Sequence, residues 1–83
     1  MESIYKYACY VVEKYDGVSP LRNDKPYVDI ARDIKRDIDK NGIPSMSRSE
    51  AFQIIKSRCL LDSAKKALDN FKTNYYSWSR NNL

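Results

Sequence analysis

Apolar residues recur at helical spacing along most of the 83-residue chain. From residue 3 to residue 15 they lie at i, i+4, i+7 and i+11, a spacing that gathers side chains on one face of an α-helix. No segment shows the sustained alternation of apolar and polar residues that is typical of a half-buried strand. The pattern therefore predicts an all-α fold, with a first helix over residues 3–15 that carries Ile4, Ala8, Val11 and Tyr15 on its apolar face.

The segment after this helix predicts a loop over residues 16–26, because its glycine, prolines, asparagine and aspartates favour turns and interrupt helices. A second helix is predicted over residues 27–40, with Pro26 near its first turn and Asp24 as a candidate N-cap. Its apolar residues keep the helical spacing and are expected in the core: Tyr27, Ile30, Ala31, Ile34 and Ile38.

Two further patterns complete the predicted helices. Ser47 and Glu50 have the spacing of a capping box, which predicts a third helix over residues 48–58. Asp62 is a candidate N-cap for a last helix over residues 62–80, with a continuous bent helix as the alternative to a break between the two. The stripe of the last helix is the clearest in the chain and contains Ala64, Ala67, Leu68, Phe71, Tyr75 and Trp78.

The whole chain, residues 1–83, is expected to form one domain. We expect a compact all-α bundle of four to five short helices that ends in a long C-terminal helix. Charged residues at 31% beside 42% hydrophobic residues are typical of a globular protein. No apolar run approaches the ~18 residues of a membrane span, and the N-terminal stretch lacks the features of a signal peptide. The sequence therefore predicts a cytoplasmic protein without membrane contact.

The absence of certain residue types excludes several classes of chemistry. Without histidine, the chain has no Ser-His-Asp or Cys-His nucleophile system and no His-containing metal site. Its only glycines, Gly17 and Gly42, exclude the glycine-rich phosphate loops. Cys9 and Cys59 lie far apart in the sequence and are expected to be buried thiols. We expect neither an enzyme nor a cofactor.

The stretch "DIDKNGIPSMSRSE", residues 37–50, begins with the D-x-D-x-N-G spacing of a calcium-binding EF-hand loop. Asp37, Asp39 and Asn41 are therefore weak candidate ligands. The loop position that needs a bidentate glutamate is Arg48, a cation. The preferred interpretation is a helix end, with Gly42 in a left-handed conformation, Ile43 packed back on the last turn and Pro44 preventing continuation.

The net charge of +4 comes entirely from the C-terminal half. Residues 1–44 carry eight basic and eight acidic residues, whereas residues 45–83 carry seven basic and three acidic ones. This half is the candidate contact surface for a protein or for a phosphate backbone, with residues 48–58 as a candidate recognition helix. A merely solvated face is the alternative. The candidate contact residues are Arg48, Lys56, Arg58, Lys65, Lys66, Lys72, Arg80 and an exposed Tyr76.

Three segments together resemble the small YozE-like proteins of Gram-positive bacteria. They are "IYKY" near the start, "DIARDIKRDIDKNGIP" in the middle and "ALDNFKTNYYSW" towards the end, so that the resemblance covers Ile4 to about Trp78. It implies a sterile-alpha-motif-like (SAM-like) helical fold and no catalytic residues. By analogy, SAM-like bundles most often bind other proteins, sometimes themselves, and occasionally nucleic acid.

These observations predict a non-enzymatic helical module that binds a protein partner. The alternative is a DNA- or RNA-binding module that uses the basic C-terminal half. A further alternative is a bacteriophage or mobile-element protein that inhibits a host protein. The sequence leaves the partner, the biological process and the oligomeric state open.

Overall fold

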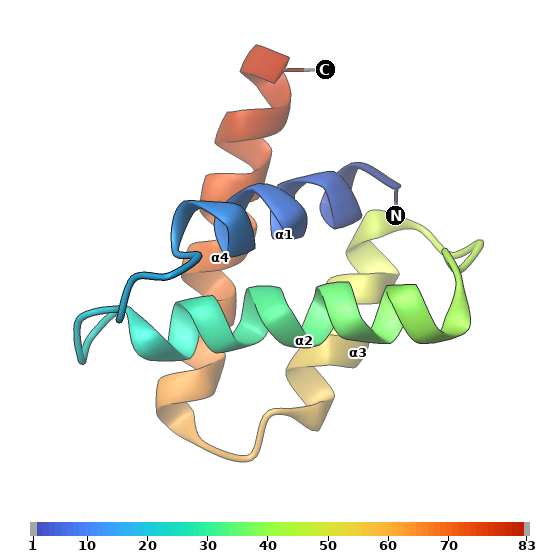
Figure 1. Ribbon diagram of the computed structural model, residues 1–83. Coiled ribbons are helices and arrows are strands. Elements are labelled where there is room, and N and C mark those ends of the chain that lie inside the picture. The colour runs from blue at the N-terminus through green and yellow to red at the C-terminus, as the bar shows by residue number, and fades with distance from the viewer. Residues whose placement is uncertain (1, 83) are drawn as a thin grey trace.

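The computed structural model of the protein describes residues 2–82. Within that range the chain forms a compact globule of four helices and no strand (Figure 1). The all-α fold predicted from the sequence is confirmed, and the last helix has 21 residues. The helices are α1 (Glu2–Lys14), α2 (Lys25–Asn41), α3 (Arg48–Arg58) and α4 (Asp62–Asn82).

The helix boundaries lie close to the predicted ones. α3 has the predicted bounds, α1 is displaced by one residue, and α4 extends two residues beyond its predicted end. α2 begins two residues earlier than predicted, because the Leu21 carbonyl accepts hydrogen bonds from the amides of Asp24 and Lys25 at 2.9 and 3.0 Å. That turn leads directly into the helix, and Pro26 lies in its first turn as predicted.

The capping predictions are confirmed only in part: α3 shows the serine half of the predicted capping box, and Asp62 is the first residue of α4 and not its N-cap. Ser47 Oγ accepts a hydrogen bond from the Glu50 amide at 3.2 Å, which satisfies one of the unpaired donors at the start of α3. Asp24 occupies the N-cap position of α2, but its side chain makes no capping hydrogen bond. Cys59 has extended backbone angles, φ −78° and ψ 118°, so α3 and α4 are separate helices and the bent-helix alternative is wrong.

Gly42 ends α2 in a different way from the one predicted. Its φ of 82° requires a glycine, but its ψ of 172° lies outside the left-handed helical region. The Gly42 amide donates to the Ile38 carbonyl at 2.8 Å, and the chain then leaves the helix in an extended direction. Ile43 consequently does not pack back on the last turn and stays 52% exposed.

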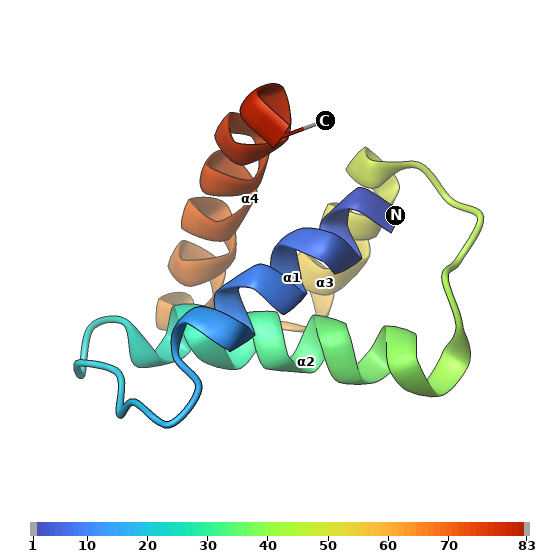
Figure 2. The ribbon, with the colours of Figure 1, turned by 45° about the horizontal axis from the view of Figure 1, so that its top comes forward.

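The core lies where the helices cross. α2 packs against both α1 and α4, and α3 packs against α4 (Figures 1 and 2). Aromatic rings occupy the centre: Phe71 and Tyr75 of α4 are fully buried, and the Phe71 ring centroid lies 5.1 Å from that of Tyr7. Phe52 connects α3 to this cluster at 5.8 Å from Tyr75. Such ring pairs pack α1, α3 and α4 onto a shared centre.

Both cysteines are free thiols that are half-buried rather than fully buried as predicted. Cys59 immediately follows α3, where its Sγ donates to the Ile55 carbonyl at 3.3 Å. The chain is turning away from the core at that point, which leaves the thiol partly accessible. Separately, none of the helices in the described range is long and apolar enough to cross a membrane.

Candidate functional site

The weak metal candidates lie on the last turns of α2 rather than in a loop. Asn41 Nδ2 donates to Asp37 Oδ1 at 3.0 Å, whereas Asp39 accepts hydrogen bonds from Lys35 Nζ, at 2.7 Å, and from the Tyr5 hydroxyl. Lys35 and then Tyr5 lower the pKa of the Asp39 carboxyl. In the part of the chain that the structure describes, no group of three or more Cys, Asp or Glu side chains gathers as a metal site.

Arg48 is exposed, and its guanidinium hydrogen-bonds to the buried Tyr75. Its Nη1 donates to the Tyr75 hydroxyl at 3.1 Å, and Ser3 of α1 hydrogen-bonds to the same hydroxyl. The hydrogen bond to Tyr75 raises the pKa of the Arg48 guanidinium, which stays charged. Arg48 therefore joins the start of α3 to α1 and α4, a structural role that the sequence pattern did not indicate.

Lys56 and Lys72 lie where α3 meets α4. Lys56 Nζ is 3.6 Å from the Asp69 carboxylate, and Lys72 Nζ lies over the Phe52 ring at 5.8 Å from its centroid. Lys65 is half-buried and two turns before Lys72 on the same face of α4. Each of these contacts holds a cation against its own protein, so part of the charge of this face is already compensated.

Tyr76 was expected to be exposed, but it is half-buried. It packs against the rings of Tyr75 and Phe52, whose centroids lie at 5.1 and 6.1 Å. Helical spacing placed Tyr76 beside the apolar stripe, and α3 covers that edge of α4. The prediction is therefore corrected: Tyr76 belongs to the margin of the core.

The remaining predicted contact residues lie on three separate parts of the surface. Arg58 lines a groove between α2 and α3, and Lys66 lines a different groove between α1 and α4. Arg80 lies near the end of α4, where its Nε donates to the Tyr76 carbonyl at 3.3 Å. The structure thus distributes the basic residues of the C-terminal half instead of gathering them in one patch.

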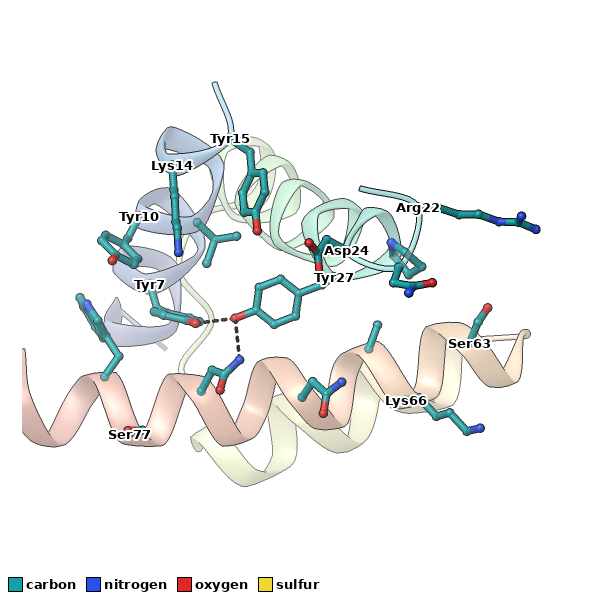
Figure 3. Close-up of a pocket in the computed structure, with 17 residues that line it drawn as sticks. Tyr7, Tyr10, Lys14, Tyr15, Arg22, Asp24, Tyr27, Ser63, Lys66 and Ser77 are labelled. Carbon is teal, nitrogen blue, oxygen red and sulfur yellow. Dashed lines mark hydrogen bonds between the residues drawn. The ribbon is translucent and has the colours of Figure 1, made fainter. Parts of the chain in front are cut away.

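The groove between α1 and α4 is rich in aromatic side chains, and we call it the aromatic groove. Its volume is about 770 Å³, and residues 22–27 close one end of it (Figure 3). The Tyr7 and Tyr27 hydroxyls hydrogen-bond across its floor, and Asn74 Nδ2 donates to Tyr27 at 3.4 Å. Burial, and then the contact with Tyr27, raises the pKa of the Tyr7 phenol. Five aromatic residues line it: Tyr7, Tyr10, Tyr15, Tyr27 and Trp78.

The charge of the aromatic groove is predominantly positive. Lys14, Arg22 and Lys66 line it together with one carboxylate, Asp24. Figure 3 shows Lys14 directed from α1 into the groove, whereas Arg22 and Lys66 lie towards one end with their side chains directed outward. None of the three cations forms a salt bridge within residues 2–82. The groove therefore presents positive charge that the protein itself leaves unpaired.

The groove between α2 and α3 has an aliphatic floor, and we call it the apolar groove. Its volume is about 480 Å³. The floor contains the edge of the α2 stripe, Ile30, Ile34 and Ile38, and on α3 Ile54 and Ile55. Ile54 lines the apolar groove and is 38% exposed. The three α2 isoleucines are buried, so the accessible aliphatic surface of the groove comes mainly from Ile54 of α3.

Two exposed apolar residues adjoin the lining of the apolar groove in the sequence. Pro44 lines the groove and is preceded by the half-exposed Ile43, and Cys59 lines it and is followed by Leu60, which is 91% exposed. The rim carries both signs of charge, and Arg36 forms a salt bridge with Asp33 there. The rim residues are Asp33, Arg36, Asp37, Lys40 and Arg58.

Most residues of the two grooves were not among the predicted contact residues. Of the predicted set, only Lys66 lines the aromatic groove and only Arg58 lines the apolar groove. One signal was available in the sequence: Leu60 and Leu61 are adjacent large apolar residues outside any helical stripe. Such a pair in a loop is typical of an exposed contact surface.

No family model, no curated protein and no solved structure matches this chain significantly.

Proposed function

We propose that this chain is a non-enzymatic interaction module that binds a partner protein through the apolar groove. The observation that carries the proposal is the aliphatic lining of this groove, in which Ile54 is 38% exposed. Ile43 and Leu60, which are also exposed, directly precede and follow the lining residues Pro44 and Cys59 in the sequence. Covering apolar surface contributes roughly 25 cal/mol per Å². A partner that covers the apolar surface of this groove is therefore stabilised by its burial, whereas a contact on the charged surface lacks this contribution.

The shape of the groove favours a helix as the bound segment. Two helices, α2 and α3, form its walls, as in other grooves that accept the apolar face of an amphipathic helix. Apolar residues at i, i+3 or i+4 and i+7 of the partner would contact Ile54 and the isoleucines of α2. Lys40 and Arg58 form no salt bridge in the described chain, so acidic residues beside that apolar stripe would complement the rim.

The sequence resemblance supports the same proposal. The YozE-like pattern implies a SAM-like bundle, and such bundles most often act by binding proteins. The alternative of a phage or mobile-element inhibitor differs from this proposal only in the identity of the partner. Nucleic-acid binding by the basic C-terminal half receives less support, since Arg58, Lys66 and Arg80 of that half lie on separate parts of the surface.

The test is a pull-down from a Gram-positive lysate with two matched variants of the bait. Ile54→Asp places a charge in the apolar groove, and Gln53→Asp places the same charge on the adjacent exposed residue of α3 outside both grooves. We expect a protein that is recovered by wild type and Gln53→Asp, survives nuclease treatment and is lost with Ile54→Asp. Circular dichroism checks that both variants remain helical.

Two results would contradict the proposal. Recovery that is equal with wild type and Ile54→Asp would place the contact elsewhere, and loss of all partners on nuclease treatment would favour nucleic acid. Sedimentation of the purified chain tests whether a second copy of the chain occupies the groove. Self-association that Ile54→Asp abolishes and Gln53→Asp preserves would assign the groove to a homodimer instead of a separate partner.

A further inference from the structure

The aromatic groove contains a ledge of rings at the edge of the core, formed by the exposed Tyr10 and by Trp78, which packs against the core. Tyr10 is 48% exposed, and its ring centroid lies 6.2 Å from that of Trp78 with an interplanar angle of 30°. The Tyr7 ring stacks on the other side of the cluster, 6.0 Å from Tyr10. A large aromatic residue that stays half-exposed on a groove wall offers a flat face on which a planar ligand can stack.

The wall opposite α1 carries carboxamides at helical spacing. Asn70, Asn74 and Trp78 follow one another at i, i+4 and i+8 on α4, so they lie on one face of the helix. A carboxamide supplies both hydrogen-bond donors and an acceptor, the combination needed for the edge of a nucleobase. The ring of Trp78 and two amides therefore lie in line along the same wall of the groove.

One of the cations that form no salt bridge in residues 2–82, Lys14, lies next to this ledge. Lys14 is one helical turn beyond Tyr10 on α1, a spacing that places the two side chains next to each other. Figure 3 shows the Lys14 ammonium directed towards α4, beside Tyr10 and near Tyr7, whereas Arg22 and Lys66 lie at the opposite end of the groove. Positive charge therefore follows directly after the aromatic surface, as in sites that hold a base and its phosphate.

We propose that the aromatic groove binds a nucleotide unit, with its base on the Tyr10–Trp78 ledge and its phosphate near Lys14. Asn70 and Asn74 contact the base edge, and Arg22 and Lys66 extend the positive path for a following phosphate. An acidic peptide would use the cations but would leave the ledge and the carboxamides without a role. The volume of about 770 Å³ lies within the ~300–1,000 Å³ of small-ligand sites. This site is separate from the apolar groove and does not depend on the function proposed for it.

The experiment uses the intrinsic fluorescence of Trp78, the single tryptophan of the chain, which lines the groove. The full chain is titrated with a short oligothymidylate, with thymidine monophosphate, with inorganic phosphate and with polyglutamate. We expect saturable quenching by the oligothymidylate. Equal affinity per site for the monophosphate would assign the groove to a free nucleotide, and much weaker binding of the monophosphate would assign it to a single strand.

Matched variants locate the contact. Tyr10→Ala is expected to weaken binding about fivefold to hundredfold, the usual effect of losing one base–aromatic stack. Lys14→Ala should reduce the slope of log affinity against log salt by about 0.7, the value for one phosphate contact on a single strand. Lys6→Ala removes the same charge from the exposed surface of α1 outside the groove and should change neither quantity.

Several outcomes would overturn the proposal. They are no quenching by either thymidylate, equal competition by inorganic phosphate alone or by polyglutamate, and equal effects of Lys6→Ala and Lys14→Ala. None of these results bears on the pull-down with Ile54→Asp, because Ile54 lines the other groove. Failure of the nucleotide proposal is thus distinguishable from failure of the protein-binding proposal.

Discussion

The two grooves lie on one small bundle and differ in the kind of surface that they leave open. The apolar groove exposes the aliphatic side chain of Ile54, which is stabilised by burial away from water and forms no hydrogen bonds. The aromatic groove exposes rings with polar atoms, such as Tyr10, together with cations such as Lys14 that lack a salt bridge in residues 2–82. The aliphatic surface is suited to a protein contact that excludes water. The rings and cations of the other groove can both be hydrated and are suited to a flat anionic ligand.

The difference originates in how completely each helix is covered. In the apolar groove the α2 isoleucines are buried in the core, and the aliphatic side chain that stays exposed is Ile54 of α3. The polar groups on the floor of the aromatic groove have partners, because the Tyr7 and Tyr27 hydroxyls hydrogen-bond to one another. The exposed lining residues lie on the walls, such as Tyr10 and Lys14 on α1 and Asn70 and Asn74 on α4. Substitutions of floor and wall residues of the aromatic groove should therefore have different effects on the free energy of unfolding.

The largest expected effect follows from Tyr7→Ala, since Tyr7 is 5% exposed and its ring contacts Phe71, Tyr75 and Trp78. Truncating a buried aromatic residue costs about 3–5 kcal/mol of the free energy of unfolding. Urea unfolding followed by circular dichroism measures that loss. Tyr10→Ala serves as the comparison on the same helix and should cost far less. Similar costs for both would show that the ledge belongs to the core.

The next largest effect is that each of two variants should lose one of the two proposed binding activities and keep the other. Ile54→Asp should abolish recovery of the protein partner and leave oligothymidylate binding unchanged, because a charge in the apolar groove opposes a dry contact. Tyr10→Ala should weaken oligothymidylate binding at least about fivefold and leave the partner bound. Pull-down and Trp78 fluorescence on the same preparations measure both. Loss of both activities in either variant would mean that the grooves act as one site.

Helical spacing identified the elements but could not identify the grooves. Ile34 and Ile38 were correctly placed in the core, because periodicity reports which face of a helix turns inward. It does not report how far a neighbouring helix covers that face, and so Ile54 was not among the predicted contact residues.

The charge count also concealed one of the surfaces. The N-terminal half carries equal numbers of acidic and basic residues and was set aside as neutral. The fold brings Lys14 and Arg22 of that half beside Lys66 of α4, whereas acidic residues such as Asp33 and Asp39 pair on α2. Local charge depends on contacts between segments that are distant in sequence, which a count along the chain does not contain.

A smaller effect is expected from Tyr75→Phe, which tests the link between the walls of the two grooves. The Tyr75 hydroxyl bonds to Ser3 of α1 and to Arg48 of α3. Removing the hydroxyl while keeping the ring should lower the free energy of unfolding by about 1 kcal/mol. Because α3 is then held less firmly, partner binding should weaken more than oligothymidylate binding. Equal weakening of the two would show that the hydroxyl stabilises the bundle as a whole.

The smallest effect concerns Asp39, which lies outside both grooves. Its hydrogen bonds from Lys35 and Tyr5 lower its pKa in the folded state, so the folded chain holds this proton less tightly than the unfolded chain does. The resulting stability is fully present above the unfolded pKa of about 3.9 and is lost as the pH falls through the lower folded value. Urea unfolding between about pH 6 and pH 2 should therefore show a shallower acid loss for Asp39→Asn than for wild type.

The control for Asp39 is Asp29→Asn, which removes an exposed carboxyl of the same helix. At pH 6 the Asp39→Asn variant should bind the partner and the oligothymidylate as wild type does, because neither groove includes this residue. If Asp29→Asn flattens the acid loss equally, the effect comes from the total charge of α2 and not from the contact with Lys35 and Tyr5. If Asp39→Asn weakens only one of the two ligands, the α1–α2 contact holds the corresponding groove in shape, and the two surfaces are less independent than their separate linings indicate.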